Sequence, residues 1–330
     1  MKLYAKENIS EAVSGMMKKD CLSHGFLLTG SVGSGRRTAA KLIASHILCE
    51  HSENPCISGN EFDEEHLCRH CKRIMNGTHP DVIYPERSGT LMNYSKATLQ
   101  NVAADAYVLP NDCDKKLYIF SDSEKIAKEN QGVLLKIIEE PPEHCCFIFT
   151  AQSREALLPT MISRLICMSV ACPSEDECFA ELTASGFAEN DVMAAVDAFH
   201  GNIGMCRSFM ETAEIRQNVA AASDFSTALT ESDEYGMLKA LASVGENRER
   251  LRSVILLCVD ILRDGLALRT GGGCLSGCCK KASEKMAALF SYQKITAAHD
   301  CFRSTLEYLD ANANVPAAAA ALTAELISMK

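Results

Sequence analysis

Apolar residues in the first half of the chain gather in three short runs, at residues 24–29, 116–122 and 146–150. Each run has the length of a buried strand. After the first run, residues 38–49 carry apolar side chains three and four positions apart, which predicts an amphipathic helix. A further helix is expected from about residue 123, and Pro141 and Pro142 should end it because proline cannot continue a helix.

The second half of the chain has a different pattern. A polar junction that contains a proline, residues 172–177, places the first domain boundary near residue 170. From residue 215 onward nearly every segment is rich in alanine and leucine with helical periodicity. We therefore expect three domains: residues 1–170, a small helical domain over 171–212, and an all-helical domain over 213–330.

The turn between the first strand and its helix reads Gly30-Ser-Val-Gly-Ser-Gly-Arg-Arg-Thr38. The motif G-x-x-x-x-G-K-[ST] surrounds phosphate oxygens with backbone N–H groups, a lysine and a magnesium-binding hydroxyl. Here Arg36 takes the lysine position and Arg37 the hydroxyl position, so Thr38 comes one residue late. A guanidinium pairs with phosphate but does not coordinate a metal. The turn therefore predicts a degenerate nucleotide site, with an ordinary strand-to-helix turn as the alternative.

The second apolar run ends in an acidic residue, Asp122, followed by Ser123 and Glu124. In ATPases a carboxylate at such a strand end helps to hold Mg²⁺, and a further residue positions the attacking water. The chain lacks an adjacent Asp-Glu pair, so the water-activating role is weakened, while Asp122 is still placed to reach a metal. The expected nucleotide-binding set is Gly30, Gly33, Gly35, Arg36, Arg37, Thr38 and Asp122.

Four cysteines between the first helix and the next strand are spaced C-x6-C-x11-C-x2-C; they are Cys49, Cys56, Cys68 and Cys71. The last pair has zinc-knuckle spacing, and four thiolates form a closed tetrahedral site. We predict a structural zinc ion that staples an insertion over residues 49–71. The alternatives are that the cysteines are incidental, or that His66 or His70 is a ligand. Most other cysteines lie in apolar patterns and are expected to pack as small apolar side chains.

Net charge limits the possible partners. The chain has 33 Lys and Arg against 43 Asp and Glu, a net charge of −10, which suits a stand-alone nucleic-acid binder poorly. No apolar run approaches the ~20 residues that span a bilayer, and the N-terminal residues lack the apolar core of a signal peptide. We expect a cytoplasmic protein with no membrane contact.

The order of these motifs resembles the bacterial clamp-loader AAA+ family, which includes the tau/gamma and delta-prime subunits of DNA polymerase III. The motifs are the phosphate loop, the four-cysteine module, Gly77-Thr-His-Pro-Asp-Val82, the strand ending at Asp122, Leu134-Leu-Lys-Ile-Ile-Glu-Glu-Pro-Pro142 and Leu158-Pro-Thr-Met-Ile-Ser-Arg164. The resemblance is strong over about residues 8–170 and fainter beyond. It implies an α/β fold: an AAA+ P-loop domain with a parallel sheet and a zinc-module insertion, then a helical lid and an all-α collar for oligomerisation.

Three departures favour the delta-prime branch, whose members resemble ATPases but usually have no productive ATP site. The first is the arginine pair in the phosphate loop, and the second is the altered end of the Asp122 strand. The third is Gly204, which stands where ATP-hydrolysing relatives carry a sensor arginine; Arg207 is one helical turn further on. The resemblance thus implies no intrinsic ATPase activity and leaves ATP binding by this chain open.

Arg164 is retained within the motif Ser163-Arg164, although Leu165 replaces the family's following cysteine. In the family this arginine is a finger that reaches the γ-phosphate held by an adjacent subunit, where such residues contribute about 10³-fold or more in rate. A helix-end arginine that pairs with a carboxylate or with capping carbonyls is the alternative. Thr150 matches a sensor position, and a hydrogen-bonding strand cap is its alternative reading.

The resemblance implies a delta-prime-like subunit of the DNA polymerase III holoenzyme, a nucleotidyltransferase complex. Such a subunit helps to load the sliding clamp on primed DNA, donates Arg164 in trans and contacts tau/gamma and delta subunits; clamp and DNA are reached through the assembled complex. Two alternatives stay open: an ATP-hydrolysing tau/gamma-type motor subunit, and a zinc-dependent nucleic-acid binder unrelated to replication.

Overall fold

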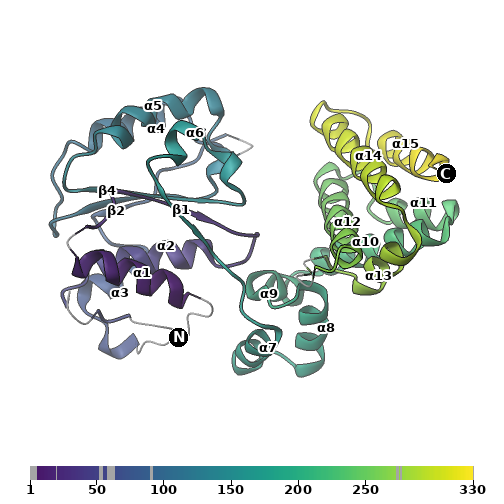
Figure 1. The fold of residues 1–330 in the computed structure, drawn as a ribbon, viewed down its shortest axis with the longest axis horizontal. Coiled ribbons are helices and arrows are strands. Elements are labelled where there is room, and N and C mark those ends of the chain that lie inside the picture. Colours follow the sequence, from purple (N-terminus) through teal and green to yellow (C-terminus); the bar gives the residue numbers. More distant parts are fainter. Residues whose placement is uncertain are drawn as a thin grey trace. The chain divides into compact units, whose positions relative to one another are not determined.

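The chain divides into two compact units, Met1–Pro173 and Ser174–Lys330 (Figure 1). The computed structural model describes residues 6–19, 21–51, 55–57, 64–89, 92–272, 275 and 277–329. No helix among these residues combines the length and apolar character that a bilayer span requires.

The first unit is built on a five-stranded sheet in the order β2-β3-β4-β1-β5, and every strand pair is parallel. The strands are β1 Gly25–Thr29, β2 Val82–Ile83, β3 Lys116–Phe120, β4 Cys145–Ala151 and β5 Ile166–Ser169. Parallel strands are buried on both faces, which explains why the three central strands read as continuous apolar runs. The parallel sheet expected from the family resemblance is confirmed.

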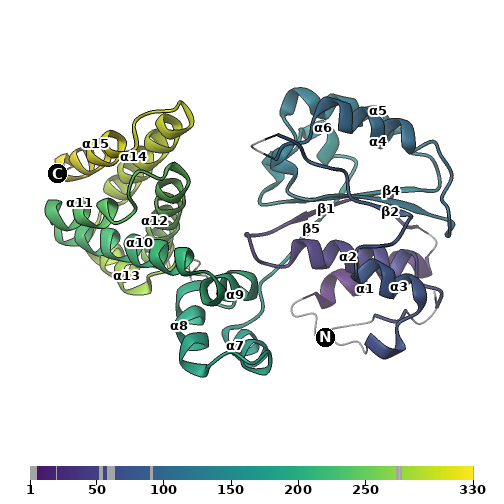
Figure 2. The same cartoon turned by 180° about the vertical axis from the view of Figure 1, so that it is seen from behind.

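Helices cover both faces of this sheet (Figures 1 and 2). Alternate side chains of β1 serve the two faces: Phe26 and Leu28 join one apolar cluster, and Leu27 joins the other. On the second face, the rings of Phe120 and Phe149 stack with centroids 4.8 Å apart. One layer holds α1 Glu7–Lys18, α2 Arg36–Ile47 and α3 Arg69–Met75, and the other holds α4 Lys96–Asp105, α5 Lys128–Glu139 and α6 Pro159–Ile162.

The helix expected from residue 123 begins later, at Lys128. Asp122 adopts a left-handed backbone conformation with φ of 54°, and Ser123–Lys125 form only a short 3₁₀ turn. The chain must therefore reverse direction before α5 can start. The helix ends at Glu139, one residue before Pro141, in agreement with the predicted stop at the two prolines.

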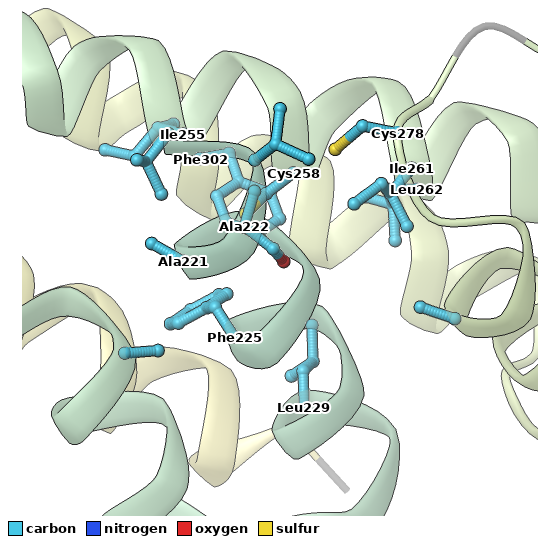
Figure 3. Close-up of a cluster of buried hydrophobic side chains, with 14 of the residues drawn as sticks. Ala221, Ala222, Phe225, Leu229, Ile255, Cys258, Ile261, Leu262, Cys278 and Phe302 are labelled. Atoms are coloured by element: carbon cyan, nitrogen blue, oxygen red, sulfur yellow. Dashed lines mark hydrogen bonds between the residues drawn. The ribbon is translucent and has the colours of Figure 1, made fainter. Parts of the chain in front are cut away.

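All elements described in the second unit are helices, in agreement with the periodicity. One apolar cluster runs through this unit and includes Phe225, Ile255, Cys258 and Phe302 (Figure 3). The predicted boundary at residue 212 falls between α9 and α10, but the cluster crosses it, so separate lid and collar domains stay a prediction. The helices are α7 Glu175–Ala184, α8 Glu189–Phe199, α9 Ile203–Glu211, α10 Ala213–Glu231, α11 Glu234–Ala242, α12 Arg248–Arg269, α13 Lys280–Leu289, α14 Tyr292–Asp310 and α15 Val315–Ser328.

Candidate functional site

The phosphate-type loop connects β1 to α2, and its glycines are required by its geometry. Gly33 and Gly35 have φ angles of 82° and 86°, which side chains other than glycine adopt at a cost. A Cβ atom on Gly30 would lie 2.7 Å from the carbonyl oxygen of Val170. The loop thus has the backbone of a phosphate cradle, and Thr38 lies in the first turn of α2.

Asp122, at the end of β3, is paired with arginines. Its carboxylate accepts hydrogen bonds from Arg37 at 2.7 Å, Arg87 at 3.1 Å and Arg36 at 3.4 Å. Burial raises the pKa of Asp122, but the Arg37 hydrogen bond and the three guanidinium charges outweigh it and hold the pKa below its usual range. The structure brings three residues of the predicted set, Asp122, Arg36 and Arg37, together with Arg87, which sequence reasoning missed and which comes from an irregular segment after β2.

The neighbours of Asp122 at this strand end are also engaged within the chain. The Asp122 backbone N–H donates to the Thr150 hydroxyl at 3.0 Å, and Thr150 is fully buried at the end of β4. Glu124 accepts a hydrogen bond from the Gln152 backbone N–H and lies 3.8 Å from the Arg36 guanidinium. Both carboxylates that would serve magnesium and water in an ATPase therefore already have partners.

Lys6 is a second residue that sequence reasoning missed. Its ammonium is buried and donates to the carbonyl oxygens of Ser34 and Ala171, each at 3.0 Å. Burial lowers the pKa of Lys6 to about 8. The residue links the start of α1, the phosphate-type loop and the segment after β5, and a lone lysine before a helix gives no sequence signal of such a contact.

Three buried polar atoms around the loop have no hydrogen-bond partner within the described part of the chain: Ser34 Oγ, Arg36 Nη1 and Ser123 Oγ. Buried polar atoms are normally satisfied. Their position beside the glycine loop suits an anion, while the pairing of Asp122 disfavours a divalent cation. Among the described residues, the two carboxylates at this strand end, Asp122 and Glu124, are both paired, so neither is free to activate water.

The four predicted zinc ligands come together in the structure. Their sulfur atoms all lie within 4.8 Å of one another, and the Cys49 and Cys56 sulfurs are 3.6 Å apart. Zinc–sulfur bonds of about 2.3 Å in a tetrahedron place sulfurs about 3.8 Å apart, so the four residues fit the ion. Cys68 also caps α3 by accepting from the Cys71 N–H. The residues between Cys56 and Glu64 of this module are only partly among those described.

A second group of ligand-type residues, His70, His79 and Cys113, lies nearby, but both histidines already have hydrogen-bond partners. The Asp81 N–H donates to His79 Nδ1 at 3.1 Å, so a neutral His79 carries its proton on Nε2 and donates to His70 Nδ1 at 2.8 Å. Burial lowers the pKa of His79, which favours this neutral form. The Nε2 atom of His70 lies 3.4 Å from a Glu50 oxygen. This chain of bonds leaves His79 without a free lone pair for a metal.

Arg164 follows α6, and its guanidinium lies against its own unit. It pairs with Glu139 at 3.0 Å and donates to the carbonyl oxygen of Thr160 at 2.8 Å. The side chain is 38% exposed. This is the geometry of the helix-end alternative, and the exposure leaves the guanidinium able to change partners.

Glycine, not arginine, occupies position 204, which the family resemblance matches to the sensor arginine. Gly204 lies in the first turn of α9, and Arg207 donates to the Ser185 hydroxyl at 3.3 Å with its guanidinium over the ring of Phe187. Arg207 is therefore engaged within the second unit.

Comparison with known proteins agrees with the motif order. The family described as "DNA polymerase III, delta subunit" matches residues 5–173. The delta' subunit of DNA polymerase III from Bacillus subtilis is 34% identical over 149 residues, which is 45% of this chain and 42% of that protein. The tau subunit from the same organism is 30% identical over 161 residues, 48% of this chain and 26% of that protein. The matched region thus spans less than half the length of these curated relatives.

Among solved structures, a gamma subunit-related protein from Thermotoga maritima aligns over 95% of this chain and 97% of its own, with 15% identity and a TM-score of 0.47. The delta clamp-loader protein of Bacillus subtilis aligns over 96% of this chain and 99% of its own, with 11% identity and a TM-score of 0.39.

Proposed function

Since the chain belongs to the DNA polymerase III delta-subunit family, we propose that it is a delta-prime-like clamp-loader subunit that does not hydrolyse ATP itself. The observation that carries this proposal is the ion pairing of Asp122 with Arg36, Arg37 and Arg87. A carboxylate held by three guanidinium groups is a poor ligand for Mg²⁺, because the cation would have to displace charges already in place. Without the metal, no divalent cation bridges the phosphate oxygens at that position, as it does in working ATPases.

In this role the chain acts on a neighbour. We propose that Arg164 is an arginine finger for ATP bound by an adjacent tau/gamma subunit. Its pair with Glu139 is largely solvent-accessible and therefore worth little energy, so exchange for a phosphate is inexpensive. The helical second unit would hold the tau/gamma and delta partners, and a structural zinc ion on Cys49, Cys56, Cys68 and Cys71 would stabilise the insertion. Clamp and primed DNA would be reached through the assembly.

The test is the DNA-dependent ATPase activity of a clamp loader reconstituted with tau/gamma and delta subunits. Arg164→Ala in this chain should silence the one site it faces, because a finger contributes about 10³-fold or more in rate there. Arg36→Ala should leave the total activity almost unchanged.

Glu139→Gln is the matched control, because it breaks the same ion pair while keeping the arginine. If the pair has only a structural role, Glu139→Gln will lower activity as much as Arg164→Ala. Loss of activity with Arg36→Ala and not with Arg164→Ala would instead identify this chain as a motor subunit.

A further inference from the structure

A cleft of about 340 Å³ lies beside the phosphate-type loop, between α2 and the irregular segment that follows β2. Arg37 and Lys41 of α2 form one wall, and Tyr84, Arg87 and Tyr94 form another. Ser121, directly after β3, also lines it, so the cleft opens at the carboxyl ends of β2 and β3. Ligands of open parallel sheets bind at this edge, and the volume is that of a small-molecule site.

The cleft is positively charged. Arg37, Lys41 and Arg87 line it, and no carboxylate does so among the described residues. Asp122 accepts from two of these cations at its edge. Lys41 donates to the Met75 carbonyl oxygen at 2.7 Å and has no carboxylate partner within the described residues. Burial lowers its pKa, as expected for a cation whose charge is not fully compensated.

A hydroxyl on the same wall is unused. The Tyr84 OH is buried and has no hydrogen-bond partner in the part of the chain that the structure describes. By contrast, the Tyr94 OH donates to the Ser121 carbonyl oxygen at 2.8 Å. Tyr84 lines the cleft, and a buried hydroxyl without a partner is accounted for if a ligand in the cleft completes its hydrogen bonding.

We propose that this cleft binds the terminal phosphate of a small ligand, a phosphate monoester or a pyrophosphate, without a divalent cation. Arg37 and Arg87 would keep their pairs with Asp122 and donate from their remaining N–H groups to the phosphate, since a guanidinium has five such donors and pairs readily with phosphate oxygens. Lys41 and the Tyr84 hydroxyl would donate from either side. Magnesium is not required, because the lining offers no carboxylate to hold it. This inference does not depend on the proposed clamp-loader role, since Lys41, Tyr84 and Arg87 lie outside the phosphate-loop motif.

The experiment is calorimetric titration of the full chain with inorganic pyrophosphate at constant ionic strength, with and without Mg²⁺. Wild type should bind in both conditions. Arg87→Ala and Lys41→Ala should each weaken binding about tenfold or more, as expected for charge-assisted hydrogen bonds, and Arg87→Lys should recover part of it. Lys18→Ala is the control with the same charge change. Lys18 is exposed in the last turn of α1. It lies roughly 17 Å along the helix axis from the first residue of α1, which is beside the loop.

If the charge variants fold poorly, Tyr84→Phe still tests the proposal. It removes only a hydroxyl that has no partner among the described residues. We expect it to weaken pyrophosphate binding severalfold and to leave the thermal stability unchanged. Failure of wild type to bind pyrophosphate overturns the proposal, including the case in which a single-stranded oligonucleotide binds instead. Loss of binding in Arg36→Ala but not in Arg87→Ala or Lys41→Ala places the anion in the phosphate loop and also overturns it. If Lys18→Ala weakens binding as much as Arg87→Ala and Lys41→Ala do, binding depends only on the net charge of the chain, and the proposal is overturned.

Discussion

The four-cysteine cluster and the end of β3 both carry ligands that metals use, yet they differ in what faces those ligands. The four sulfurs face one another, and the Cys49 and Cys56 sulfurs are 3.6 Å apart. The Asp122 carboxylate instead faces three guanidinium groups. Four thiolates so close together would repel one another unless a cation lay between them, whereas the Asp122 carboxylate already has cations as neighbouring side chains.

The comparison teaches that ligand residues alone do not define a metal site. The group of His70, His79 and Cys113 makes the same point. Its ligand atoms lie within 4.8 Å of one another, but the ring nitrogens of the two histidines already contact each other, the Asp81 N–H and the side chains of Arg69 and Glu50. A group of ligand residues needs a metal only where no neighbouring protein group already neutralises their charge or satisfies their hydrogen bonds.

The largest expected effect concerns the cysteines. Cys68→Ser should abolish zinc binding and lower the free energy of unfolding of the first unit by several kcal/mol, because metal binding free energy becomes folding free energy (on the order of 10 kcal/mol for structural zinc). Zinc content by elemental analysis and a denaturant titration measure the two effects.

Cys113→Ser is the control, because its sulfur lies 3.3 Å from His70 Nδ1 and outside the four-cysteine cluster. Equal zinc loss in both variants, or wild-type protein without zinc, would contradict the distinction between the two clusters.

A smaller effect is expected at Asp122. Asp122→Asn keeps a residue type that tolerates φ of 54° but leaves Arg36, which is almost fully buried, and its two neighbours without a full counter-charge. We expect a loss of about 2 kcal/mol in the free energy of unfolding. Asp112→Asn is the comparison, since its pair with Arg73 is exposed and should cost under about 1 kcal/mol. Equal losses of unfolding free energy in the two variants would show that the arginine network around Asp122 stabilises the protein no more than an exposed ion pair does.

The smallest effect is a pH dependence. The pKa of Asp122 is lowered in the folded state, so its contribution to stability is complete above the unfolded pKa of about 4 and is lost as the pH falls through the folded pKa. The pKa values of Asp81 and Asp105 are also lowered. Urea unfolding from pH 7 to pH 3 should therefore show the stability gap between wild type and Asp122→Asn closing at the acid end. A gap that does not change with pH would show that the charge of Asp122 is not what stabilises the network.

Much of the fold follows from short-range signals. The order of β1, the glycine loop and α2, the end of α5 before Pro141 and the convergence of four cysteines are each encoded within a few residues or a recognisable spacing. The contacts that decide the chemistry of the site are not encoded in such local signals. Arg87 reaches Asp122 across 35 positions, and Lys6 reaches Ala171 across 165.

The late start of α5 illustrates why local reasoning fails there. Residues after Asp122 have helical periodicity, but the left-handed Asp122 and its hydrogen bond to Thr150 of another strand make the chain turn first. Only tertiary contacts specify that turn, and no pattern within the segment predicts it.

The pairing of Arg164 with Glu139 makes the proposed finger a choice between two anions. A neighbour's phosphate must attract the guanidinium more strongly than one carboxylate and the Thr160 carbonyl together. A terminal phosphate with more negative charge than a carboxylate meets this threshold more easily than a neutral or singly charged group. The ion pair would thus set the resting position of the proposed finger: the guanidinium would leave Glu139 when a terminal phosphate comes within its reach across the interface, and would stay on Glu139 when none does.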